Sequence, residues 1–172
     1  MLDLLRQLVL SQLEASVCML DECIRKCPAQ HWDSPIGKYP FWHVAYHTLC
    51  FIDVYLSPSD EAWQPRQGGP GGGLHPLGRV ELEEEYPSRR FEQCELLEYS
   101  ALCRQKARDV LTSETRETLE GPSGFPWLAF SRAEAHVYNI RHIQHHAGQL
   151  SAFLRRQGVE THWVKSGWRE NV

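Results

Sequence analysis

The sequence predicts an all-α protein: a four-helix bundle with a long crossover between its second and third helices. Three observations lead to this fold class. Apolar residues recur at helical spacing in four separate segments, no segment shows a convincing strand pattern, and a glycine-rich stretch interrupts the helical pattern in the middle of the chain. The length of 172 residues predicts a single domain over residues 1–172 that buries a sizeable core.

Composition and charge exclude several classes of protein. The net charge is −4 and no basic stripe occurs, so we expect no nucleic-acid partner. No apolar run approaches the ~20 residues that span a bilayer, so no membrane partner is expected. Asp3 and Arg6 interrupt the first leucines, which argues against a signal peptide. The six cysteines form no CxxC pair and are expected to be reduced, mostly buried thiols of a cytoplasmic protein.

The first two helices are bounded by prolines. The first is expected from residue 2 to about 27, where Pro28 ends it, and the second covers residues 41–56, with Pro40 at its start. The second helix is apolar nearly all round, which places it in the centre of the bundle. Its few polar side chains therefore need a partner or a metal ion. They are His43, His47, Thr48 and Asp53.

The crossover is expected over residues 57–87, and its Gly-rich part could cover a site. A third helix follows from about residue 88 to 111, and then a second loop leads to the last helix. Ser131 and Glu134 form a Ser-x-x-Glu capping pattern at the start of the last helix, and Gly158 is placed to end it. In the C-terminal tail, residues 159–172, we expect Trp163 and Trp168 to pack against the bundle.

The most informative residues are His142 and His146 in the last helix. Side chains four residues apart lie on one helix face, so both imidazoles can reach one metal ion. His43 and His47 have the same spacing in the second helix, and one of them is expected to complete the site. Three imidazole ligands would leave coordination positions open, which is typical of catalytic rather than structural sites. His145 is expected to be exposed, turned away from this pair.

Other catalytic patterns are absent from the sequence. It contains no HExxH, so the glutamate base of the zinc proteases is not available. Glu134 and His136 lack the spacing of a di-iron bundle, and no GxSxG supports a nucleophilic triad.

The segments Pro40-Phe41-Trp42 to His47-Thr48-Leu49 and His142-x-x-x-His146-x-Gly148-Gln149-Leu150 resemble the DinB-like (damage-inducible) four-helix bundle superfamily. The resemblance covers most of the chain, and its most specific part is the HxxxHxGQL pattern. Many members have arginine after the second histidine, where this chain has Ala147. This departure removes a basic group near the site without touching the expected ligands.

The resemblance implies a divalent metal ion bound by His47, His142 and His146. It favours His47 over His43, because the family histidine follows the aromatic residue that opens the second helix, here Trp42, by about five residues. Zinc or nickel is expected first, with iron or manganese as alternatives. No catalytic residue is assigned beyond the ligands.

Characterised members of the superfamily include transferases and isomerases that use mycothiol, bacillithiol or glutathione. The resemblance therefore implies a metal-dependent enzyme, with a small molecule and a low-molecular-weight thiol as partners and a homodimer as the expected assembly. The alternatives are a non-enzymatic metal-binding stress-response protein and a dimeric scaffold, because a shared fold does not fix the reaction.

Overall fold

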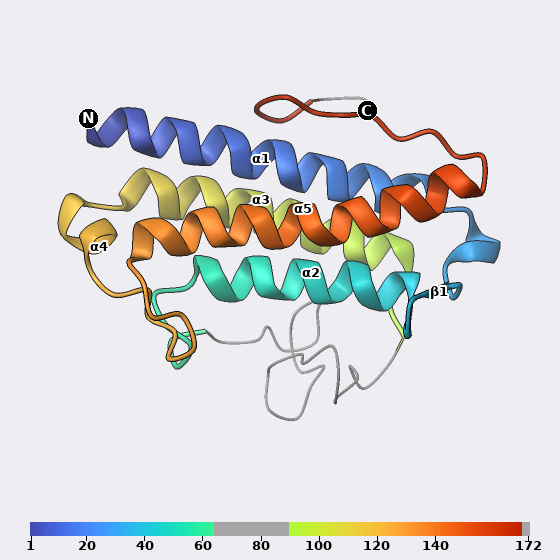
Figure 1. Cartoon of the computed structure of the whole chain (residues 1–172), viewed down its shortest axis with the longest axis horizontal. Coiled ribbons are helices and arrows are strands. Elements are labelled where there is room, and N and C mark those ends of the chain that lie inside the picture. Colours follow the sequence, from blue (N-terminus) through green and yellow to red (C-terminus); the bar gives the residue numbers. More distant parts are fainter. Residues whose placement is uncertain (64–89, 170–172) are drawn as a thin grey trace.

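The computed structural model describes residues 1–63 and 90–169, and four long helices form a bundle (Figure 1). The long helices are α1 (Leu2–Lys26), α2 (Phe41–Leu56), α3 (Gln93–Ser113) and α5 (Arg132–Arg156). The shorter elements are the 3-10 helix η1 (Ala29–His31), the strands β1 (Pro35–Ile36) and β2 (Tyr39–Pro40), and the helix α4 (Arg116–Glu120). The predicted all-α class is therefore confirmed.

The order of the helices explains the long crossover. α1 and α5 run in one direction, and α2 and α3 run in the other (Figure 1). Because α2 and α3 are parallel, the end of α2 and the start of α3 lie at opposite ends of the bundle, which fits the predicted long crossover. The expectation that the Gly-rich segment covers a site falls on residues outside the described part of the chain.

α2 is the most buried helix, and α1, α3 and α5 surround the core with it. Every residue of α2 except Phe51 is buried, as its all-round apolar sequence predicts. Asp53 is satisfied by three side chains, because its carboxylate accepts hydrogen bonds from Tyr99, Trp63 and Lys106. This network fixes the C-terminal half of α2 to α3.

The ends of α5 follow the sequence signals. The Ser131 hydroxyl accepts a hydrogen bond from the Glu134 amide at 3.2 Å. At the other end Gly158 adopts a φ of 79°, the left-handed conformation that ends many helices.

α3 begins later than predicted, at Gln93 rather than near residue 88. The reason is a capping box. The Glu92 side chain accepts from the amide of Glu95, and the Glu95 carboxylate accepts from the Glu92 amide at 2.9 Å. The Gln93 side chain then donates to the main-chain oxygens of Ile24, Arg25 and Cys27, which ties the start of α3 to the end of α1.

One prediction about the tail is confirmed and one is wrong. Trp168 packs against the bundle, with the Arg104 guanidinium 4.0 Å from its ring centroid. Trp163 is 66% exposed. The tail lies along α1, where the Gly167 amide donates to the main-chain oxygen of Ser11 at 2.9 Å. Val164 is buried against Ala15 and Cys18 of α1, whereas the neighbouring Trp163 side chain faces away from the bundle.

A buried ion pair closes the end of the bundle where α5 begins. The Arg132 Nε donates to Glu114 Oε1 at 2.9 Å, and both side chains are less than a tenth exposed. The remaining guanidinium nitrogens donate to three main-chain oxygens at the end of α2. These belong to Tyr55, Leu56 and Ser57. Arg132 therefore caps α2 and neutralises Glu114 at the same time.

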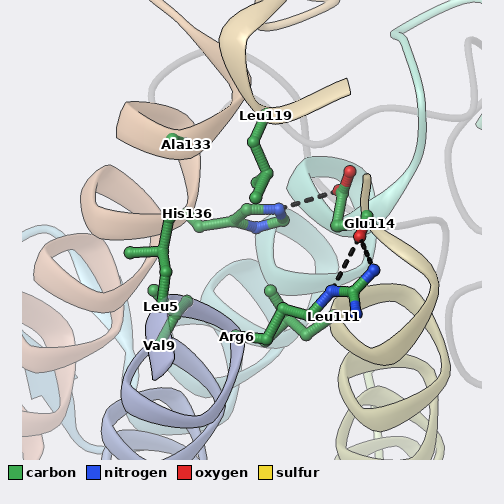
Figure 2. Close-up of a pocket in the computed structure, with 8 residues that line it drawn as sticks. All are labelled: Leu5, Arg6, Val9, Leu111, Glu114, Leu119, Ala133 and His136. Carbon is green, nitrogen blue, oxygen red and sulfur yellow. Dashed lines mark hydrogen bonds and ion pairs between the residues drawn. The ribbon is translucent and has the colours of Figure 1, made fainter. Parts of the chain in front are cut away.

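His136 and Arg6 complete this end of the bundle (Figure 2). His136 Nε2 donates to Glu114 Oε1 at 2.9 Å, and Arg6 donates to the main-chain oxygen of Glu114. Beside His136 lies a small cavity with largely apolar walls from α1, α3, α4 and α5. Glu114 thus connects α1, α3 and α5 through one residue.

Candidate metal centre

Three histidine side chains converge between α2 and α5. His47 lies in the middle of α2, and His142 and His146 come from successive turns of α5. His47 and His146 are each only 7% exposed, and His142 is half-buried. The group therefore sits at the contact between the two helices.

The nitrogen positions fit one metal ion. The Nε2 atoms of His47 and His142 are 3.2 Å apart. One ring nitrogen from each of the three histidines lies within 4.8 Å of the others, so the group could hold a metal ion. Two nitrogens at ~2.1 Å from a tetrahedral ion are ~3.4 Å apart, so small side-chain shifts would close the site.

The surroundings keep the two rings of α5 neutral. Burial, together with the neighbouring histidines, lowers the pKa of His142 to about 3. Burial also lowers the pKa of His146. Neutral imidazole carries the lone pair that a metal ion needs, so these two rings are ready to bind at pH 7.

The rival histidine of α2 does not join this group. His43 is fully buried and stacks on Trp42, with ring centroids 5.3 Å apart. Burial lowers its pKa to about 4. His145 is exposed, as expected.

Aromatic rings border the histidines on the side toward the start of α5. The rings of Phe51 and Tyr55 lie 5.6 and 6.1 Å from the His142 ring, measured between centroids. Phe51 also contacts His47 at 4.8 Å. These residues follow His47 by one and two turns of α2, a spacing that would have identified them in the sequence.

Sequence reasoning also missed Gln149. Its Oε1 lies 3.0 Å from Nδ1 of His146. The signal was present, because Gln149 is three residues after His146 and therefore lies on the same helix face.

The cysteines lie outside the histidine group. None of the six forms a disulfide, and only Cys94 is exposed. Burial raises the pKa of Cys23 and of Cys27 to about 12, so these two are protonated, unreactive thiols at neutral pH.

The fold and the site together define a helical bundle that presents histidines between two facing helices, a usual place for metal sites in bundles. A family model described as the DinB family matches residues 8–172, and the chain belongs to this family. Comparisons with curated proteins and with solved structures found no match. Within residues 1–63 and 90–169, no helix is both long and apolar enough to span a bilayer.

Proposed function

We propose that this protein is a metal-dependent enzyme that transfers a low-molecular-weight thiol to a small electrophile, with His47, His142 and His146 as the metal ligands. The observation that carries the proposal is a group of three imidazoles that includes no carboxylate and no cysteine. A divalent ion held by three neutral ligands would keep its full charge and open positions, and could lower the pKa of a thiol. Zinc or nickel is expected first, with iron or manganese as alternatives.

The thiol must come from outside the chain, because no cysteine belongs to the histidine group. Glutathione, mycothiol and bacillithiol are the candidates. In the transfer, the sulfur lone pair forms a bond to the electrophilic carbon. The leaving group takes the electron pair of the bond that breaks, and the thiol proton passes to solvent.

The aromatic neighbours support an apolar electrophile. Phe51 and Tyr55 border the histidines with ring faces and edges, and Phe51 is partly exposed. Such walls exclude water and strengthen electrostatic interactions at the reacting atoms. Their role in the proposal is to hold the carbon skeleton of the electrophile beside the thiol.

The test compares His146→Ala with His31→Ala. His146 belongs to the histidine group, whereas His31 lies in η1 and contacts Ser34 and Phe153. We would purify both variants and the wild type without chelator and measure bound metal by elemental analysis. Thiol consumption would then be followed with each of the three thiols and a panel of electrophiles.

We expect His146→Ala to lose both the metal and the thiol consumption, while its circular dichroism spectrum remains helical. His31→Ala should keep both. A wild-type protein that binds metal but consumes none of the three thiols would overturn the enzymatic proposal and favour a metal-binding stress-response protein. A wild-type protein without metal affinity would overturn the site itself.

We also propose that the protein is cytoplasmic. Its six cysteines, five of them buried, form no disulfide, which suits a reducing compartment.

We propose further that the protein forms a homodimer. Met1, Leu4 and Leu8 are more than half exposed at the start of α1 and offer an apolar face for a second copy. Light scattering should give twice the monomer mass, and Leu8→Glu should reduce it toward the monomer. A wild-type monomer at all concentrations would contradict the dimer.

A further inference from the structure

We infer that Gln149 is a positioning residue that selects the tautomer of His146 suited to metal binding. This inference rests on the proposed metal site. Gln149 lies on α5, one turn after His146, and its Oε1 is 3.0 Å from Nδ1 of His146. A carboxamide oxygen can only accept, so Nδ1 must carry the proton and donate it. Nε2 of the same ring then has the free lone pair that a metal ion requires.

A second hydrogen bond engages the nitrogen end of the Gln149 amide. Its Nε2 lies 3.1 Å from Nε2 of His145, and it donates to that ring. If the amide were reversed, its NH2 group would donate to Nδ1 of His146 and move the ring proton to Nε2. That tautomer could not bind a metal ion through Nε2. His145 and Gln149 together therefore hold His146 in the form that binds.

The other ligand of α5 lacks this support. Nδ1 of His142 is buried and has no hydrogen-bond partner among the described residues. In metal sites, a ligating imidazole usually donates its second ring nitrogen to an acceptor, and loss of such an acceptor typically weakens metal affinity 10- to 100-fold. Gln149 supplies this acceptor for His146, so its removal should have an effect of that size.

Gln149 is exposed, which makes the inference testable without unfolding the protein. Gln149→Leu removes the acceptor and keeps a helix-favouring side chain of similar bulk. Gln149→Glu keeps an acceptor oxygen facing Nδ1 of His146. Gln144→Leu is the matched control, because Gln144 lies on the same helix but contacts Met19 of α1.

Each variant would be titrated with Zn²⁺ in competition with a chromophoric chelator, and the visible spectrum of the Co²⁺ form would report the ligand geometry. We expect Gln149→Leu to raise the Kd for zinc 10- to 100-fold and to change the cobalt spectrum. Gln149→Glu should bind zinc at least as tightly as the wild type. Gln144→Leu should match the wild type, and all variants should melt within a few degrees of it without metal.

The outcomes separate this inference from the proposed site. Wild-type protein that binds no zinc overturns the site and the inference together. Wild-type binding with an unchanged Kd in Gln149→Leu overturns the role of Gln149 and leaves the site standing. Equal weakening in the Leu and Glu variants would show that hydrogen-bond acceptance by residue 149 is not the cause.

Discussion

Glu114→Gln should destabilise the metal-free protein at neutral pH and leave it unchanged in acid. Burial alone raises the pKa of Glu114, but hydrogen bonds from three side chains more than offset it and lower the pKa to about 2. These side chains are His136, Thr118 and Arg132. Glutamine has nearly the same shape and can occupy the same position. The substitution therefore removes the charge and one of the two acceptor oxygens, because the amide nitrogen of glutamine can only donate.

The magnitude follows from the pKa. A carboxyl group whose pKa falls from 4.5 to about 2 on folding stabilises the folded state by about 3 kcal/mol at pH 7, at about 1.4 kcal/mol for each pH unit. Loss of one partner from a buried ion pair typically costs about 3–5 kcal/mol of stability, which agrees with the value obtained from the pKa. Arg132, only 6% exposed on its side chain, would remain buried without a counter-charge.

The sign of the pH dependence is fixed by the lowered pKa. The stabilisation is complete above the unfolded-state pKa and is lost as pH falls toward the folded-state value. Denaturant unfolding of the wild type and of Glu114→Gln should therefore differ by about 3 kcal/mol at pH 7. The difference should shrink below pH 4.5 and approach zero near pH 2.

The control is Glu120→Gln, the same change in the exposed pair of Glu120 with Arg116. It should alter the free energy of unfolding little at any pH, because exposed ion pairs are screened by water. A difference between wild type and Glu114→Gln that stays constant from pH 7 to pH 3 would refute the reasoning. So would a negligible difference at pH 7.

Three further predictions concern the metal and the backbone. Zinc should raise the melting temperature of the protein. This increase should persist somewhat below pH 6.5, because burial lowers the pKa of His142 and of His146. Loss of the zinc effect already at pH 6.5 would contradict this prediction. Gly124→Ala should lower the free energy of unfolding by about 2–4 kcal/mol. The reason is that φ of Gly124 is 89° and a Cβ there would lie 2.0 Å from the main-chain oxygen of Pro58. Gly148→Ala, on open helix surface, should instead stabilise by up to about 1 kcal/mol in denaturant melts.

The parts of the fold that depend on local sequence could be predicted. α2 has the predicted bounds because Pro40 starts it and Ser57-Pro58 ends it, and α5 begins after Ser131 as its capping pattern indicates. The predicted start of α3 was wrong because Glu92 and Glu95 form a capping box that contains neither serine nor threonine. The hairpin of β1 and β2 was missed because strands of two residues carry no periodic signal.

Contacts between distant residues could not be predicted in this way. The pairing of Glu114 with Arg132 and His136 depends on where α3 and α5 meet, which periodicity does not specify. For the same reason the spacing of His43 and His47 left both open as partners of the α5 pair. The structure brings His47 to the pair, whereas His43, one turn earlier on α2, contacts Trp42 and Tyr39 instead.

The hydrogen-bond partners of His136 and His146, two buried histidines of α5, indicate different roles for these residues. His136 donates to a carboxylate that Arg132 neutralises, which suits a structural role. His146 donates to the amide of Gln149, which orients the ring without adding negative charge beside the proposed site. Gln149→Glu should therefore bind zinc tightly but activate a thiol less well, because the added charge favours the protonated thiol. The pH–rate profile for thiol consumption should shift to higher pH than in the wild type. An unchanged profile in a variant with intact zinc affinity would show that the neutrality of Gln149 has no catalytic consequence.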